Sequence, residues 1–349
     1  MVFMLNVGII GMGFNGSLHF ANCFKIKGIN VLAVADKSNS ARKKAQKYGV
    51  KNIYDDYNKL LEERKDLDCV IISLPNFLHY DCVIKSLEEG NNVFVEKPLA
   101  NTVEQCKSIK SKVEQTGLKL MIGHAMRYYD AIQKMKAKVD NGEIGDLEFF
   151  TSESIMNGPL AHGTVPRPVP DWWFQPDLVG GGVLLDLGYH LIDLYHYFMG
   201  ESKLVFANFD YKYNLEVEDT AVILLQNDKK ENVNGYINVG WYQKSIFPKY
   251  DYRCVVHGDA GHLSTDDYIP KNMYFYAMKE GMKNFLKRIT GGKINVLSYT
   301  YFYESFYKEL THFFDSVSND IETDVTVDDG IRTMKIIEDS YKKYGRKII

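Results

Sequence analysis

The chain has 349 residues, enough for two domains of ordinary size. Its 42 lysines and arginines against 45 aspartates and glutamates leave a net charge of −3, which argues against a nucleic-acid partner because no basic surface is available. A hydrophobic share of 45% and a charged share of 25% are typical of a globular protein and exclude a disordered or fibrous chain.

The cysteines and the apolar runs indicate an intracellular protein. Five cysteines with no Cys-x-x-Cys pair suggest neither a disulfide framework nor a thiolate site, so we expect no metal. The first seven residues contain no basic leader and no cleavage site. The longest apolar run, residues 183–199, is interrupted by two aspartates and two histidines, which are costly in a bilayer. We therefore expect a cytoplasmic protein without membrane contact.

Residues 5–124 alternate short apolar runs with longer segments of helical period, the pattern of repeated βα units. Strands are predicted at 5–10, 31–36, 70–74, 92–95 and 118–123, and helices at 17–27, 40–48 and 80–89. Several of the strand runs are apolar throughout, as expected for strands buried on both faces. A doubly wound parallel sheet of the Rossmann type is therefore predicted.

Beyond residue 124 the pattern changes to that of an open, mostly antiparallel sheet. A helix at 131–141 is followed by strands predicted at 148–155, 203–211, 220–226, 234–241 and 252–257, and by final helices at 301–317 and 328–344. The segment 158–182 is rich in proline and glycine, a loop long enough to suggest a function. The fold class is α/β plus α+β, divided into 1–124 and 125–349, with the final helices expected to pack back across the seam.

The first motif is Gly11-Met12-Gly13-Phe14-Asn15-Gly16, which follows a predicted strand and opens a predicted helix. Its glycines allow a pyrophosphate to approach the backbone and the helix N-terminus. Asp36 ends the next strand, where a carboxylate would meet the ribose 2′-hydroxyl and repel a 2′-phosphate. NAD is therefore favoured, while the nearby Lys37 and Arg42 leave NADP possible.

Polar residues follow two further strands, at the edge where open α/β sheets bind ligands. Ser73-Leu74-Pro75-Asn76 follows one strand, and Glu96-Lys97-Pro98 follows the other. Pro98 restricts the backbone next to Lys97, so the ammonium group could be held against a substrate oxygen. The alternative is an ordinary solvated lysine.

The third motif is the start of a helix, where three glycines at 180–182 precede Asp186 and His190. On a helix these two side chains lie four residues apart and share a face. Histidine has a pKa suited to accept the proton that an alcohol loses on oxidation. A structural histidine hydrogen-bonded to an upstream aspartate is the alternative.

These three motifs, in this order, resemble the glucose-fructose oxidoreductase, inositol dehydrogenase and rhizopine-catabolism (Gfo/Idh/MocA) family of NAD(P)-dependent oxidoreductases. Gly123-His124-Ala125-Met126-Arg127, a tryptophan shortly before Pro176-Asp177, and Asp328-Asp329-Gly330 also match, so the resemblance covers nearly the whole chain. It implies a Rossmann domain followed by a sheet domain whose exposed face makes homodimers or homotetramers. It also implies that Lys97, Asp186 and His190 line the substrate site, and that the cofactor is contacted by Ser73, Pro75, Asn76, His79 and Glu96.

The expected reaction is hydride transfer between NAD(P) and a hydroxyl-bearing carbon of a sugar, cyclitol or related polyol. We expect His190 to take the hydroxyl proton, Lys97 to stabilise the alkoxide, and Asp186 to orient the substrate or the imidazole. Candidate substrate contacts, for each of which simple packing is an equal alternative, are Arg127, Asn157, Trp172 and Trp173. Rival functions are an NAD-dependent glycoside hydrolase acting through transient oxidation, a non-catalytic dinucleotide sensor, and an enzyme acting on non-sugar carbonyls or imines.

Overall fold

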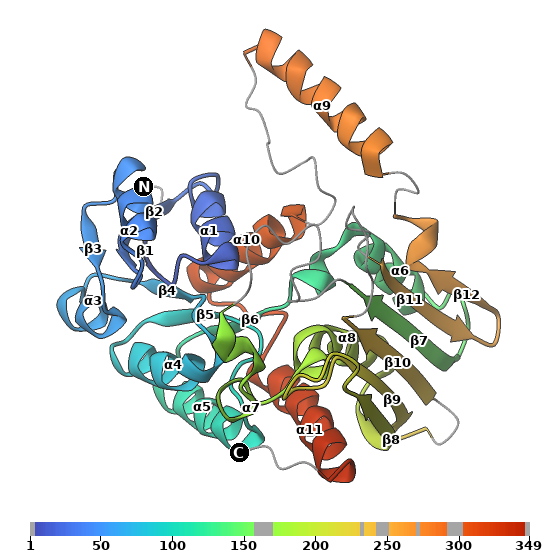
Figure 1. Cartoon of the computed structure of the whole chain (residues 1–349). Coiled ribbons are helices and arrows are strands. Elements are labelled where there is room, and N and C mark those ends of the chain that lie inside the picture. Colours follow the sequence, from blue (N-terminus) through green and yellow to red (C-terminus); the bar gives the residue numbers. More distant parts are fainter. Residues whose placement is uncertain are drawn as a thin grey trace.

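The described residues form two six-stranded sheets connected by helices (Figure 1). The computed structural model describes residues 4–156, 170–230, 234–241, 251–269, 273–291 and 303–345. The first sheet uses residues up to 123, and the second uses residues 147–264.

The first sheet is parallel throughout and has the strand order β3-β2-β1-β4-β5-β6. Its strands are β1 (Leu5–Ile10), β2 (Ile29–Ala35), β3 (Asn52–Tyr54), β4 (Cys69–Ile72), β5 (Asn92–Glu96) and β6 (Leu120–Gly123). Strands β4 and β6 are buried over their whole length, since helices cover both faces of the sheet. The doubly wound sheet is confirmed. Strand β3 escaped prediction because it is only three residues long and half-buried.

The helices of this half are α1 (Phe14–Cys23), α2 (Asn39–Lys47), α3 (Tyr57–Glu63), α4 (His79–Glu88) and α5 (Val103–Thr116). The Thr102 side chain caps α5 at its start, and Gly117 ends it in the left-handed conformation. Helix α1 begins earlier than predicted, inside the glycine motif, and ends at Cys23 instead of residue 27. Its N-terminus therefore lies directly at the glycine loop.

The second sheet has the order β12-β11-β7-β10-β9-β8 and is mostly antiparallel, as expected. Its strands are β7 (Leu147–Ile155), β8 (Ser202–Asp210), β9 (Thr220–Asn227), β10 (Asn234–Gly240), β11 (Asp251–Gly258) and β12 (Gly261–Ser264). One pair, β7 with β10, is parallel, so the sheet is mixed. That pair joins segments about 80 residues apart, beyond the reach of a local sequence pattern.

The helices of the second half are α6 (Asp130–Asp140), α7 (Pro176–Val179), α8 (Tyr189–Met199), α9 (Met273–Ile289), α10 (Tyr303–Asn319) and α11 (Val327–Lys343). Helix α10 packs against α1, whereas α11 packs against α5, α8 and strand β8. The last two helices therefore return to the first sheet from the far end of the chain (Figure 1). Helix α9 has no counterpart among the predicted elements.

Candidate functional site

A cleft of about 1520 Å³ opens at the carboxyl ends of the first sheet and reaches across to the second half of the chain. The glycine loop, the ends of β2, β4 and β5, and the segment before α8 all contribute to its wall. The predicted site residues of the three sequence motifs that line it are Gly11, Gly13, Phe14, Asn15, Asp36, Lys37, Ser73, Pro75, Asn76, Glu96, Lys97, Asp186 and His190. Trp172 and Trp173 also line it, in a short helical turn, Asp171–Phe174.

The three glycines of the loop are needed for different structural reasons. A Cβ on Gly11, whose φ is +88°, would lie 2.4 Å from the Ser73 carbonyl oxygen, and one on Gly16 would lie 2.0 Å from that of Gly11. A Cβ on Gly13 would meet nothing within 4 Å. Gly11 and Gly16 therefore allow the loop to pack against β4 and α1, while Gly13 leaves the space at the N-terminus of α1 open. This arrangement fits a dinucleotide pyrophosphate.

Asp36 follows β2 and lies beside the glycine loop. Its carboxylate accepts hydrogen bonds from the backbone N–H groups of Met12 and Ser38, both at 2.6 Å. The Arg42 guanidinium is turned toward backbone, donating to the carbonyl oxygens of Asp36 and Lys37 at 2.7 and 2.8 Å. The polar group at the expected ribose position is therefore an anion, which fits a 2′-hydroxyl better than a 2′-phosphate.

Lys97 crosses from the end of β5 to the other half of the chain. Its Nζ donates to the backbone oxygen of Asp186 at 2.7 Å and to Oδ1 of Asp186 at 3.1 Å. The Lys97–Pro98 peptide bond is cis. Both side chains are mostly buried, with 14% of the Lys97 side chain and 26% of the Asp186 side chain exposed. The ammonium group is therefore held by fixed acceptors at the cleft wall.

The sequence predicts Asp186 and His190 on one regular α-helix, but the structure places them on two different helical segments. A π-helical segment, Leu184–Gly188, contains Asp186, and α8 begins after it. The Nδ1 atom of His190 is buried and has no hydrogen-bond partner among the described residues. Burial, together with the positive charge of Lys97, holds the pKa of His190 well below its usual range. The imidazole at the cleft is therefore neutral.

Glu218, just before β9, holds the segment in front of α8 in place. Its side chain is fully buried and accepts from the backbone N–H groups of Gly182 and Leu184 at 3.0 and 3.1 Å. The Tyr341 hydroxyl donates to the same carboxylate at 2.6 Å. A Cβ on Gly182 would lie 2.1 Å from the Glu218 carbonyl oxygen, so glycine is required there. The role of Glu218 could not be predicted, because no local motif connects it to residue 182.

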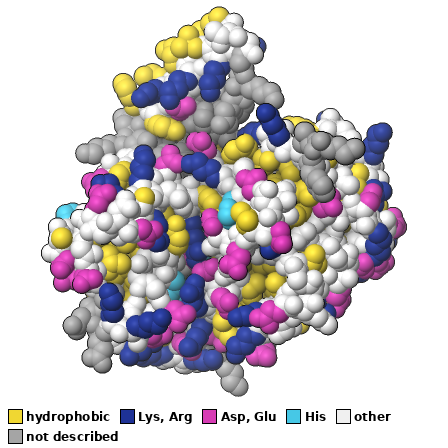
Figure 2. Space-filling model, turned by 180° about the vertical axis from the view of Figure 1, so that it is seen from behind, with side chains coloured by type: hydrophobic (Ala, Val, Ile, Leu, Met, Phe, Trp, Pro, Cys, Tyr) yellow, Lys and Arg dark blue, Asp and Glu magenta, His cyan; other side chains and the backbone are white. Residues whose placement is uncertain are grey.

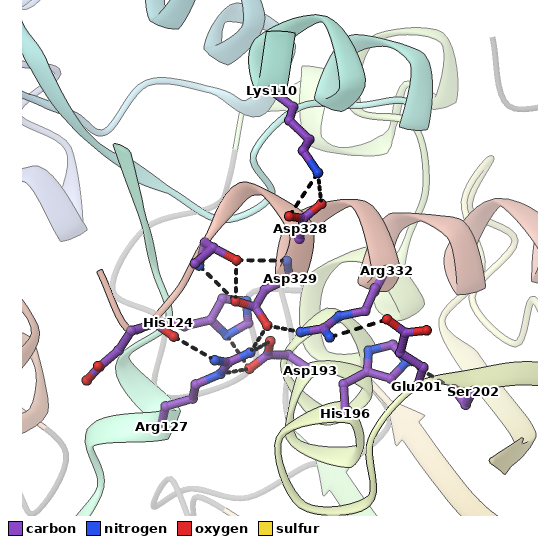
Figure 3. Close-up of polar contacts among 12 residues, drawn as sticks. Lys110, His124, Arg127, Asp193, His196, Glu201, Ser202, Asp328, Asp329 and Arg332 are labelled. Atoms are coloured by element: carbon purple, nitrogen blue, oxygen red, sulfur yellow. Dashed lines mark hydrogen bonds and ion pairs between the residues drawn. The ribbon is translucent and has the colours of Figure 1, made fainter. Parts of the chain in front are cut away.

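Three of the expected site residues that the structure describes lie outside the cleft wall: Gly16, which packs against the Gly11 carbonyl, Arg127 and His79. Arg127 is buried in an ion-pair network (Figure 3), where it donates to Asp193 at 2.5 and 2.7 Å and to Asp329 at 2.9 Å. The guanidinium of Arg127 is therefore occupied by two buried carboxylates and does not line the cleft, and its contact with a substrate stays a prediction. The buried ring of His79 lies within hydrogen-bond distance of the Pro98 and Leu74 carbonyl oxygens, at 2.7 and 2.9 Å, so it holds the cleft loops instead of lining the cleft. Asn157 lies outside the described residues.

Other residues reach the cleft from distant parts of the chain. Tyr57, Trp241 and Phe306 line it but belong to no sequence motif. Within the described ranges, no group of three or more histidine, cysteine, aspartate or glutamate side chains could hold a metal ion. None of the described helices is both long enough and apolar enough to span a membrane.

The chain matches two family models in succession. Residues 5–124 match an oxidoreductase family with an NAD-binding Rossmann fold (GFO_IDH_MocA), and residues 132–264 match the GFO/IDH/MocA C-terminal domain. Among curated relatives, the oxidoreductase YrbE of Bacillus subtilis is 26% identical over 94% of this chain and 91% of its own length. The myo-inositol 2-dehydrogenase of Thermotoga maritima is also 26% identical, over 83% of this chain and 89% of its own length.

The fold matches solved structures over almost its entire length. The scyllo-inositol dehydrogenase of Lactobacillus casei, solved with bound NAD(H) and scyllo-inositol, aligns with a TM-score of 0.79 and 23% identity over 98% of both chains. The glycine loop that lines the cleft lies within the part of the chain that matches the NAD-binding family model. This chain belongs to the Gfo/Idh/MocA family of NAD-binding oxidoreductases.

Proposed function

We propose that this protein is a dehydrogenase that oxidises a hydroxyl group of a sugar, cyclitol or related polyol, or catalyses the reverse reduction. The observation that supports this most is the convergence of Lys97, Asp186 and His190 on the same cleft as the glycine loop. Bound NAD supplies the hydride acceptor. Relatives that act on inositol favour a polyhydroxylated substrate.

His190 is the proposed base. Its pKa is held low, so the imidazole is neutral and can accept the hydroxyl proton as the carbon loses hydride. Lys97 donates a charged hydrogen bond to the oxygen, which stabilises the developing alkoxide. Asp186 is the positioning group, because its backbone and side-chain oxygens hold the Lys97 ammonium. In the reduction direction His190 returns the proton to the same oxygen.

Trp172 and Trp173 are the proposed substrate-binding aromatics. Their ring centroids lie 6.0 Å apart, and Trp172 contacts Phe77 edge-on at 5.6 Å, so one wall of the cleft presents aromatic surface. Such surface suits the apolar C–H faces of a sugar or cyclitol ring. The polar edge of the ring would then face Lys97 and His190.

The test is Lys97→Met, which keeps an unbranched side chain of nearly the same length and removes the charge. We expect turnover to fall by a factor of about 10² to 10³ because one stabilising donor is lost. The NAD dissociation constant stays nearly unchanged, since Lys97 meets the reacting oxygen. Turnover is measured as NADH formation across a panel of inositols, aldoses and glycosides, and Lys107→Met, at an exposed lysine of α5, is the control. Wild-type turnover retained in Lys97→Met would remove Lys97 from the mechanism.

A further inference from the structure

Helix α9 stands apart from both sheets (Figure 1). Many of its large apolar side chains are exposed. Six large apolar residues of this helix are each between 55 and 67% exposed: Phe275, Met278, Met282, Phe285, Leu286 and Ile289. We refer to them as the α9 seam. Figure 2 shows hydrophobic side chains gathered on this projecting part of the molecule. An exposed apolar stripe of this kind marks an interaction surface.

The opposite face of α9 is polar and less exposed. Asn284 is only 4% exposed, and the Glu280 side chain is 14% exposed. Burial and the nearby charges of Glu280, Glu304 and Asp130 raise the pKa of Tyr276, so this face is turned toward the starts of α10 and α6. An ordinary surface helix buries its apolar face and exposes its polar face, whereas α9 exposes its apolar face and buries part of its polar face. Such a helix needs a partner to cover its apolar side.

The spacing of the seam indicates the kind of partner. Phe275, Met278, Met282, Phe285 and Ile289 follow one another at intervals of three and four residues in alternation, the a/d repeat of a coiled coil. Leu286 lies at the e position beside this repeat. The a and d side chains of such a repeat pack into the spaces between those of another helix. The observations therefore favour a second helix over a lipid surface.

The area of the seam is sufficient for a stable pair of helices. Six side chains of this size and exposure present roughly 700 Å² per chain, so a symmetric pair would bury on the order of 1,400 Å². That total lies within the range of specific interfaces. Twofold pairing is the simplest closed arrangement, because the same surface then serves both partners.

We propose that the α9 seam pairs with the same helix of a second copy of this chain, around a twofold axis near Met282. This contact is separate from the association through the exposed face of the second sheet that the family resemblance implies. Where both contacts form, loss of the α9 contact halves the size of the assembly.

The first test is the double variant Met282→Glu and Phe285→Glu. Both side chains are exposed, so the chain should fold, which circular dichroism and an unchanged melting temperature check. We expect the mass measured by sedimentation to fall to half that of the wild type. Lys287→Glu, on the same helix but outside the seam, changes the charge by the same amount and should leave the mass unchanged. Equal masses for the double variant and the wild type would overturn the proposal.

A second test uses cross-linking by Met282→Cys. All five native cysteines are buried, so the introduced thiol is the reactive one. Diamide should oxidise two such thiols to a disulfide across the axis and produce a covalent dimer, whereas Lys283→Cys should give at least tenfold less. An intramolecular contact of the seam would leave Met282→Cys monomeric and would contradict the proposal.

The dependence of binding on salt and on lipid distinguishes pairing of two α9 helices from binding of α9 to a membrane. The helix carries Lys279, Lys283, Lys287 and Arg288 against Glu280, so two copies repel each other at low ionic strength. Self-association should therefore strengthen as salt rises from about 0.05 to about 0.5 M. Binding to phosphatidylserine vesicles that weakens with salt, without self-association in solution, would show a membrane helix and overturn the proposal.

Discussion

At the scale of single residues, two buried carboxyl groups differ in charge because their neighbours differ. Asp329 is held ionised: burial would raise its pKa, but Arg127 outweighs burial and lowers it. Glu309 is fully buried on α10, and neither oxygen has a hydrogen-bond partner among the described residues. Burial, and then the nearby Glu96, raise the pKa of Glu309 well above its usual value, so this group is protonated in the folded protein.

Glu309→Gln should change how stability depends on pH. The folded Glu309 binds its proton more tightly than the unfolded chain does, so its contribution to stability is complete below the unfolded pKa and is lost as pH rises above it. For each unit by which the pH rises, the free energy of unfolding of the wild type should therefore fall by about 1.4 kcal/mol relative to that of Glu309→Gln. Urea denaturation between about pH 5 and pH 8 measures this difference. Parallel curves would contradict it, and Glu304→Gln, exposed on the same helix, is the control.

Asp36→Ala tests the choice of cofactor at a single residue. Removing a charged acceptor from the ribose hydroxyl should weaken NAD binding by at least about tenfold, while NADP binding weakens less or improves. Titration of both dinucleotides measures the ratio of the two affinities. If that ratio stayed the same, the assignment of Asp36 to the ribose would be wrong. Asp81→Ala, exposed on α4, is the matched control.

At the scale of elements, the site consists of the ends of strands and the starts of helices. Strands β2, β4 and β5 deliver Asp36, Ser73 and Lys97 to the same edge because all three run in parallel. The glycine loop joins β1 to α1 and directs the helix N-terminus at the cleft. The regular packing of the sheet therefore positions groups that lie up to about 60 residues apart in sequence.

Gly13→Ala and Gly11→Ala separate binding from folding within this loop. A methyl group on Gly13 enters open space, so the melting temperature without cofactor should stay close to that of the wild type. The same methyl group obstructs the pyrophosphate, and NAD binding should weaken by about tenfold or more. Gly11→Ala should instead unfold at lower temperature, since its φ of +88° and the Ser73 carbonyl both disfavour a side chain. Equal effects of the two variants on stability would contradict this division.

At the scale of the whole molecule, α11 connects the first sheet to the segment before α8. Lys110 of α5 pairs with Asp328 at 2.7 Å, and Asp329 pairs with Arg127, which also binds Asp193 of α8 (Figure 3). At the other end of α11, Tyr341 bonds to Glu218. The end of the chain therefore helps to place Asp186 opposite Lys97.

Tyr341→Phe should test this long-range connection. The Tyr341 hydroxyl donates to Glu218 and accepts from the backbone N–H of Gly182 at 3.2 Å, and the loss of these two buried hydrogen bonds should lower the free energy of unfolding by at least about 1.5–3 kcal/mol. Because Glu218 also holds the backbone of Gly182 and Leu184, turnover should fall while NAD affinity is preserved. Tyr344→Phe, whose hydroxyl contacts only a carbonyl near the surface, should change neither quantity by as much. Full turnover in Tyr341→Phe would show that α11 does not support the site.

Much of the first sheet and of the cleft could be predicted from local patterns. The glycine motif, Asp36 and Lys97 each follow an apolar strand, and the parallel fold brings strand ends together. The ion pairs of Arg127 could not be predicted, because a cationic side chain within a motif looks the same in sequence whether it faces a substrate or two buried carboxylates. Glu218 and Tyr341 escaped prediction because their role depends on contacts 36 and 123 residues away, respectively.

The sequence by itself determined most of the order of elements, the dinucleotide-binding loop and the membership of an oxidoreductase family. These are local properties, because apolar periodicity, glycine spacing and the charge at a strand end each depend only on residues close together in the sequence. Only the tertiary structure decided which polar groups meet. The Lys97 contact with Asp186, the π-helical turn and the exposed seam of α9 arise from packing between distant segments, where burial and charge depend on neighbours that the local sequence does not specify.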